Sequence, residues 1–335
     1  MKQLLKELCS LSAVSGRESE VRDYILEKID GFCDATVDPM GNIIAFKKGK
    51  KRSSKKVMLD AHMDEVGLII KGITDGGFLK FETVGGIDTA VLLSRPVKIG
   101  EINGVIASKP VHLIGKDEAK KLPKKDELYI DIGAESKLRA ESVVSLGDTA
   151  VFVSKFEDLG DLVKAKAIDD RAGCAVLIEL LKKDSEFDFW AVFSTAEEIG
   201  CRGAAAAAYT VAPDAAIVIE ATTAADIEGV PDSEKVCRLG EGAVLSFMDR
   251  GTVYDENLYR LAFQTAKENA VKVQPKAAVA GGNNASKIHL TRGGIPTAAL
   301  SVPCRYIHSP SSVADINDIY SVLSLAENMI GELCK

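Results

Sequence analysis

The sequence predicts an α/β protein in which a mainly parallel sheet is covered by helices and a small β-rich domain is inserted into the chain. Two observations lead to this prediction. Short apolar runs typical of buried strands alternate with stretches of helical periodicity at both ends of the chain. Between them, over residues 67–158, glycines interrupt short β-like segments and helical periodicity is mostly absent. We therefore expect one domain built from residues 1–66 and 159–335, and a second built from residues 67–158.

The first part of the chain predicts two helices followed by two strands. Apolar residues at positions 4–11 share one helical face, and a capping-box pattern at residues 15–18 precedes a second apolar face. A strand is expected at residues 43–46. Residues 47–56 are basic and predict a solvated turn, which leads into a buried strand at residues 57–62.

The middle segment is expected to form the inserted β-rich domain. Its glycines occur singly and in pairs, as they do where short strands turn. Residues 116–125 are highly charged and predict an exposed loop. The segment carries none of the candidate ligand residues described below, so the chemistry is not expected to require it directly.

The rest of the chain returns to alternating strands and helices. Strands that alternate with helices form parallel sheets with helices on both faces. We expect strands at residues 189–193, 216–220 and 297–302, and helices at residues 172–181, 203–209, 256–269, 286–291 and from residue 315 onward.

Composition and charge narrow the class of protein. Of the 335 residues, 46% are apolar and 27% are charged, as in globular proteins with a sizeable core. The net charge of −7 and the lack of a long basic block argue against nucleic acid or an anionic membrane as a partner. No apolar run has transmembrane length, and the N-terminus lacks the features of a signal peptide. The seven cysteines never form a CxxC pair and predict reduced thiols in a cytoplasmic protein.

Reactive side chains gather where the predicted strands end, which is where α/β sheets bind ligands. Imidazole and carboxylate ligands without cysteine suit Zn²⁺, Co²⁺ or Mn²⁺. Two such ions that share one carboxylate need five protein ligands, so that each ion receives one histidine, one carboxylate and the bridge. The candidates are His62, Glu197, Glu198, Glu220 and His308 at strand ends, and Asp169 and Asp170 at a loop-to-helix junction.

Two neighbouring pairs of residues predict a division of roles. Residues 62 and 64 share one side of a strand end, so Asp64 is expected to accept the second N–H of His62 and orient its ring. Consecutive residues project differently, so Glu198 is expected to bind metal while Glu197 faces the substrate as a general base. The other histidines have no such context and are interpreted as structural residues: His112 and His289.

Five motifs then connect the sequence to a known family. They are AHMDEVG (61–67), AIDDRAGC (167–174), STAEEIGCRGA (194–204), VIEATTAADIEG (218–229) and SVPCRYIHSP (301–310). With these motifs the chain resembles the tetrahedral family of dinuclear metallo-aminopeptidases, which includes glutamyl and deblocking aminopeptidases and members labelled endoglucanase. The resemblance covers essentially the whole chain, in order.

The resemblance implies a zinc-peptidase-like fold and two divalent metal ions per subunit. It implies that His62, Asp169 and Glu220 hold one ion. It also implies that Asp169, Glu198 and His308 hold the other, so that Asp169 bridges the pair. Zn²⁺ or Co²⁺ are the expected metals, with Mn²⁺ as a further candidate.

The resemblance has implications beyond the ligands as well. Glu197 would be the general base, and Asp64 would orient His62. The peptide bond between Asp169 and Asp170 would be cis, as in related enzymes. Related proteins use the region of the insert to assemble into dimers and hollow dodecamers, so a homo-oligomer is expected.

Two positions depart from the family pattern. Many relatives have aspartate where this chain has Glu220, and GGNNAS (281–286) stands where the family typically has GGTDAG. Asn284 thus replaces an acid, which bears on substrate preference near that loop and leaves the metal ligands untouched.

We expect an aminopeptidase that acts on short peptides, and two alternatives stay open. A glycoside hydrolase would use paired carboxylates but would leave His62 and His308 unexplained. A non-catalytic scaffold with the same fold would normally have lost a ligand or the base, and all of these positions are present.

Overall fold

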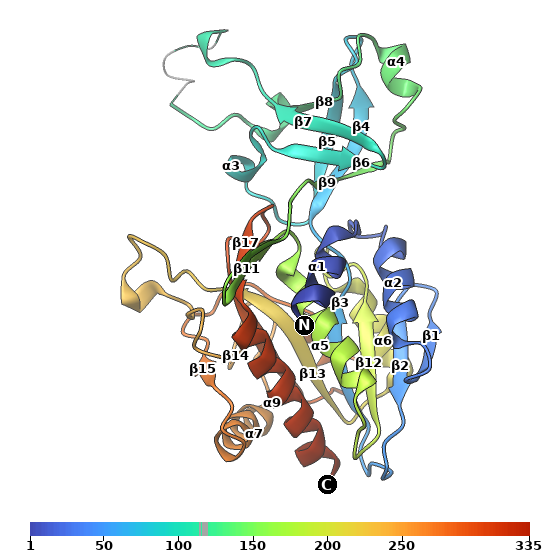
Figure 1. The fold of residues 1–335 in the computed structure, drawn as a ribbon, viewed down its shortest axis with the longest axis vertical. Helices are drawn as coiled ribbons and strands as arrows, with labels where there is room; N and C mark the ends of the chain where they lie inside the picture. The colour runs from blue at the N-terminus through green and yellow to red at the C-terminus, as the bar shows by residue number, and fades with distance from the viewer. Residues whose placement is uncertain (114, 116–119) are drawn as a thin grey trace.

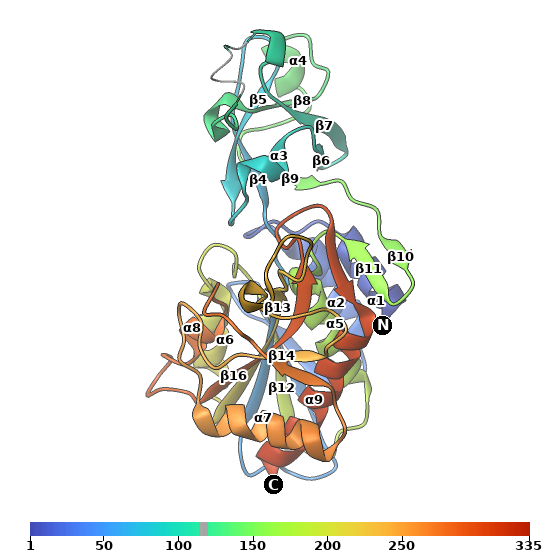
Figure 2. The ribbon, with the colours of Figure 1, turned by 90° about the vertical axis from the view of Figure 1, so that its left-hand side faces the viewer.

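The computed structural model describes residues 1–113, 115 and 120–335, and it has two parts. The larger part is an α/β domain built from both ends of the chain, so N-terminal and C-terminal elements lie around one sheet (Figure 1). The smaller part is a β-barrel from the middle of the chain, joined to the larger part at one end (Figure 2). Residues 116–119 of the expected exposed loop lie outside the described residues, and residues 120–122 are exposed.

An eleven-stranded sheet forms the centre of the larger domain. Two of its strands lie off the main path: β14 (Ala243–Leu245) pairs with β16 and with β15 (Val273–Pro275). The others run in the order β1 (Asp34–Val37), β2 (Ile43–Lys47), β12 (Phe189–Ser194), β3 (Val57–His62), β13 (Ala215–Thr223), β16 (Thr297–Arg305), β17 (Ser312–Asp315), β11 (Leu162–Ala165) and β10 (Glu157–Leu159).

The sheet is mixed, so the prediction of a mainly parallel sheet is correct only for its centre. Strands β12, β3, β13 and β16 pair in parallel, as connections through helices require. On either side of them, β1, β2, β17, β11 and β10 pair antiparallel with their neighbours. Short turns join β1 to β2 and β10 to β11, and a short turn can only reverse the chain direction.

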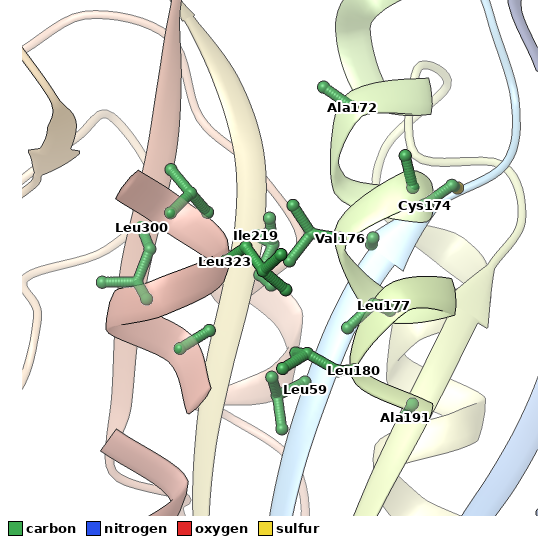
Figure 3. Close-up of a cluster of buried hydrophobic side chains, with 14 of the residues drawn as sticks. Leu59, Ala172, Cys174, Val176, Leu177, Leu180, Ala191, Ile219, Leu300 and Leu323 are labelled. Carbon is green, nitrogen blue, oxygen red and sulfur yellow. The ribbon is translucent and has the colours of Figure 1, made fainter. Parts of the chain in front are cut away.

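Helices cover both faces of the sheet. Side chains of β3 alternate between the two cores, with Leu59 and Ala61 in one and Met58 in the other. In the first core, Leu177 and Leu180 of α5 lie beside Leu59 (Figure 3). This core includes α1 (Lys2–Ser10), α2 (Ser19–Ile29), α5 (Ile168–Lys182), α7 (Glu256–Glu268) and α9 (Ile316–Cys334), and the second includes α6 (Arg202–Val211) and α8 (Ala285–Ile288).

The inserted segment forms a closed barrel with its own apolar core, which includes Leu68, Phe81 and Ile130. The short helices α3 (Thr89–Leu92) and α4 (Lys137–Glu141) lie beside the barrel, and β10 belongs to the large sheet instead. Single 3₁₀ turns occur at Val111–Leu113, Lys125–Glu127 and, in the larger domain, Asp232–Glu234. The barrel strands are β4 (Gly67–Ile73), β5 (Leu79–Val84), β8 (Tyr129–Asp131), β7 (Ile102–Ala107), β6 (Pro96–Ile99) and β9 (Thr149–Phe152).

The cysteines are not cross-linked. All seven thiols are free, and all but Cys33 are buried. Among the helices that the structure describes, none is long and apolar enough to cross a membrane.

Candidate metal centre

The predicted site residues converge at the carboxyl ends of the central parallel strands. The strand pairing accounts for this: His62 is the register partner of Ser194, which precedes the Glu197–Glu198 pair by three residues. The neighbouring strand β13 carries Glu220 beside Ser301 of β16, and β16 leads into the loop of His308. Asp169 lies at the start of α5, whose first residues depart from helical backbone angles.

One ligand triad consists of His62, Asp169 and Glu220. The Nε2 atom of His62 lies 3.3 Å from Asp169 Oδ1 and 3.3 Å from Glu220 Oε1. The three donor atoms all lie within 4.8 Å of one another, and all three residues are buried. This spacing allows a single divalent cation to contact every donor.

A second triad consists of Asp169, Glu198 and His308. The Nε2 atom of His308 lies 3.3 Å from Asp169 Oδ2 and 3.4 Å from Glu198 Oε2. Asp169 therefore directs one carboxylate oxygen toward each histidine, and the two triads share it. Shared carboxylates of this kind bridge paired metal ions.

The charge of the site fits a pair of cations. Burial raises the pKa of Glu220 and of Glu198 well above the usual range, and the nearby Asp169 carboxylate adds to both shifts. The pKa of Asp169 is lowered instead, because hydrogen bonds with His308 and His62 outweigh the effect of burial. Three carboxylates and two imidazoles thus share one largely buried space, where the carboxylates, once all ionised, bring together a concentrated negative charge. Bound divalent cations would neutralise that charge.

Asp64 links the first triad to the Glu197–Glu198 segment. Its Oδ1 atom lies 3.3 Å from His62 Nδ1 and accepts a hydrogen bond from the Glu197 amide at 3.0 Å. Its Oδ2 atom accepts from the Glu198 amide at 3.1 Å and from the Ser15 hydroxyl at 2.6 Å. Burial would raise the pKa of Asp64, but these hydrogen bonds outweigh it, so the pKa is lowered. Asp64 stays ionised and fixes both the imidazole and the backbone of the adjacent acids.

Glu197 lies beside the two triads and belongs to neither. Its carboxylate lines the pocket above them and accepts a hydrogen bond from the Cys201 thiol, whose sulfur is 3.3 Å from Oε1. Burial raises the pKa of Glu197, and the nearby carboxylates of Asp169 and Asp64 contribute further. A carboxylate with a raised pKa at the mouth of a metal site is suited to accept and return a proton.

Comparisons with known proteins identify the family of this chain. The model of the M42 glutamyl aminopeptidase family matches residues 41–325. A lysyl aminopeptidase of Pyrococcus furiosus is 32% identical over 346 residues, which cover 99% of this chain and 97% of that protein. This chain belongs to the M42 family. The predicted resemblance to the tetrahedral aminopeptidases is confirmed.

Solved structures of M42-like aminopeptidases match the whole chain. Aminopeptidase APDkam598 from the archaeon Desulfurococcus kamchatkensis is 36% identical with a TM-score of 0.94, covering 98% of this chain and 94% of that one. The TET1 peptidase of Pyrococcus horikoshii, which can assemble into a tetrahedron or a large octahedral shell, is 33% identical. Its TM-score is 0.86, and 98% of each chain is covered. These matches agree with a mixed α/β domain that carries a small barrel.

The pocket next to the two ligand triads has a volume of about 160 Å³ and mixed polarity. One wall carries Lys276, which is 7% exposed and donates to the Ala280 carbonyl at 2.8 Å. Asp249 lies in the same wall, but the amides of Gly251 and Thr252 and the Tyr254 hydroxyl already donate to its carboxylate. Sequence analysis did not find Lys276, because an isolated lysine in a loop carries no pattern.

Asn284, which departs from the family pattern, does not line the pocket. Asn284 is 1% exposed, and its amide donates to Asp60 Oδ2 at 2.7 Å and to the Ser194 hydroxyl at 2.8 Å. The preceding residue, Asn283, lines the pocket instead. Asn284 thus ties the wall of the pocket to the strands β3 and β12, which carry the site.

Glu18 and Asp170 support the site through hydrogen bonds that the sequence did not predict. The prediction of a capping box at residues 15–18 is wrong: α2 begins without a side-chain cap, and Ser15 donates to Asp64. Glu18 instead accepts from the amides of Gly16 and Ala196, at 2.7 and 3.2 Å. Asp170 accepts from the His62 amide at 3.3 Å and from the Gly173 amide at 2.9 Å.

The remaining expectations about the site concern a peptide bond and two histidines. The bond between Asp169 and Asp170 is cis, as the resemblance implied. His112 is exposed on the barrel domain, and His289 contacts the carbonyl of Ala285 in its own short helix. Neither histidine belongs to a candidate metal cluster among the described residues.

Proposed function

We propose that the protein is a dinuclear metallo-aminopeptidase that removes N-terminal residues from short peptides. One observation supports this above all others: two ligand triads share Asp169 beside a further carboxylate, Glu197, in one pocket. Membership of the M42 family supports a peptidase function independently.

The donor set suits two divalent cations, with Zn²⁺, Co²⁺ and Mn²⁺ as the candidates. His62 and Glu220 would hold one ion, Glu198 and His308 the other, and Asp169 both. When bound, such a pair activates a water molecule and polarises the scissile carbonyl group of the substrate.

The residues of the chain itself supply proton transfer and orientation. Glu197 accepts a proton from the attacking water and donates it to the amine that leaves. Asp64 holds the His62 ring and, through two amide hydrogen bonds, the backbone that presents Glu197 and Glu198. Carboxylates near the metals hold the free α-amine of the substrate, which favours cleavage after the first residue.

Removal and return of metal would test this proposal directly. The chelator-treated protein is expected to lose the hydrolysis of amino-acid nitroanilides, and Zn²⁺, Co²⁺ or Mn²⁺ is expected to restore it. Release of sugar from cellulose that does not respond to the chelator would favour the glycosidase instead. Two bound metals with no hydrolysis of any peptide or nitroanilide would favour the scaffold.

We also propose that the protein works as a cytoplasmic homo-oligomer. The assembly of the related TET1 peptidase into closed shells supports the oligomer. The seven unpaired cysteines support a reducing compartment.

A further inference from the structure

The inserted domain reaches the second ligand triad through two consecutive glycines. Gly85 and Gly86 follow β5 of the barrel, and they contact Glu198 and His308 respectively. These are the two ligands that belong to the second triad alone. We propose that the Gly85–Gly86 turn is a positioning element that sets the geometry of the second metal site. This inference rests on the dinuclear centre proposed above.

The contact with His308 fixes the orientation of its ring. The Nδ1 atom of His308 lies 2.8 Å from the carbonyl oxygen of Gly86. A carbonyl can only accept, so Nδ1 carries a hydrogen, and Nε2 is the ring nitrogen that faces Asp169 and Glu198 and would offer its lone pair to a bound cation. Metal-binding histidines usually have such a partner, which sets the tautomer.

His308 needs this partner more than the other ligands do. It lies in the loop after β16 with a φ of 58°, and its side chain is 33% exposed, whereas that of His62 is 1% exposed. His62 is held by Asp64 from within its own domain. The carbonyl that orients His308 comes from the insert.

The contact with Glu198 depends on a glycine at position 85. Gly85 has a φ of +84°, and a Cβ atom there would lie 2.8 Å from Val66 Cγ1 and 3.2 Å from Glu198 Cβ. Any side chain would therefore be strained and would push against the ligand segment. The absence of a side chain lets the turn lie directly on Glu198.

One of the two segments that join the insert to the larger domain holds the same loop. The Ser154 hydroxyl, just after β9, donates a hydrogen bond to the carbonyl of Pro310, two residues from His308. A turn within the insert and one of the two segments that join the insert to the larger domain thus touch the second triad or its loop. The position of the barrel and the geometry of the second metal site are coupled.

Metal titration of the Gly85→Ala variant would test the coupling. Calorimetry and visible absorption would follow the two Co²⁺ binding events. We expect the affinity of one of them to fall by about 10- to 100-fold, the usual cost of losing a partner of a metal-bound histidine. The other event and its absorption band are expected to stay as in the unmodified protein. The matched control is Gly133→Ala, which has a similar φ of +73° in the same domain and open space around it.

Several outcomes would overturn the proposal. Unchanged titration of Gly85→Ala, equal weakening of both events, or the same loss in Gly133→Ala would each do so. If Gly85→Ala does not fold, Ser154→Ala decides, since it is expected to weaken the same single event and an unchanged titration would overturn the coupling. Fewer than two binding events in the unmodified protein would contradict the dinuclear centre itself.

Discussion

Glu197 and Glu198 are consecutive, but their side chains meet different parts of the site. Glu198 Oε2 lies 3.4 Å from His308 Nε2, whereas Glu197 lies outside both triads and contacts the Cys201 thiol. Asp64 accepts from both backbone amides, which holds the backbone that presents the two carboxylates. This geometry suits one acid as a ligand and the other as a base.

Glu197→Gln is expected to keep both metals and to lose most turnover. The amide preserves the shape of the side chain without its basicity, and general-base catalysis contributes about 10²- to 10⁴-fold. Nitroanilide kinetics together with elemental analysis of the same sample would measure both properties. Near-normal turnover with full metal content would exclude Glu197 as the base.

Substitutions of Asp169 and of His308 are expected to have different effects on metal content. His308→Ala removes a ligand of one triad and is expected to lower metal content toward one ion per chain. Asp169→Asn weakens the shared ligand, so both sites are expected to lose affinity. Elemental analysis after dialysis would compare them, and two metals per chain in Asp169→Asn would exclude the bridging role.

Lys276 is expected to select for an acidic side chain at the N-terminus of the substrate. It is a buried cation in the pocket, and only one hydrogen bond from its ammonium group, to Ala280, is described. Burial lowers its pKa, and the nearby Asp249 counters part of that shift.

Lys276→Met is expected to lower kcat/KM for a glutamyl nitroanilide by roughly 10- to 100-fold, since hydrogen bonds to charged groups contribute about 1.5–3 kcal/mol. The value for a leucyl nitroanilide is expected to change little and serves as the internal control. An equal loss for both substrates would contradict the selective role.

The sequence predicted which side chains form the site, but it did not predict the backbone groups that hold them. His62, Glu220 and His308 stand at the ends of apolar runs, where an imidazole or carboxylate is conspicuous. The Gly86 carbonyl has no such signal, because every residue has a carbonyl and only the fold brings this one to His308.

Among the elements, β3 and α5 are joined by a buried group of charges next to the site. Glu65 follows the end of β3 that carries His62, and its carboxylate accepts from Lys166 at 2.7 Å and from Arg171 of α5 at 3.2 Å. Arg171 also donates to the carbonyl of Leu8, and Glu65 accepts from the Ala13 amide, so the N-terminal segment is included. The group holds three separate elements in place behind the ligands.

Glu65→Gln is expected to destabilise the fold by about 3–5 kcal/mol, because it leaves two buried cations without their counter-charge. Urea unfolding of the metal-free protein would measure this. The matched control is Glu186→Gln, which breaks the exposed pair with Lys51 and is expected to change stability far less, because water screens exposed ion pairs. Equal costs for the two variants would contradict a structural role for the buried group.

The elements that sequence analysis predicted are those with long apolar runs. Strands β3, β12 and β16 and helix α9 are buried along most of their length, so their hydrophobic pattern is unambiguous. Strands such as β1 and β10 were missed, because all their residues are exposed and only pairing with a neighbour makes them strands. Together with β2, β11 and β17, which also pair antiparallel, those edge strands make the sheet mixed.

For the whole molecule, the barrel presents apolar surface that the single chain does not cover. Leu138 of α4 is 79% exposed, and Val143 and Leu146, which follow it, are 47% and 65% exposed. Exposed apolar side chains in one short segment are typical of a contact surface. The barrel's own apolar core shows that this domain can bury other apolar residues, so these three are available for another subunit.

We expect the purified protein to be a homo-oligomer whose contacts fall largely on the barrel. Light scattering across a dilution series would give the mass, and a double variant with Leu138→Glu and Leu146→Glu is expected to form a smaller species, because buried charges oppose association. Leu290→Glu, at a 68% exposed leucine in the larger domain, is the control and is expected to leave the mass unchanged. If a closed shell limits access, the smaller species should still cleave nitroanilides and should gain activity on long polypeptides. A monomer at every concentration with full peptidase activity would exclude the assembly. The metal centre of a single subunit would then be sufficient for activity.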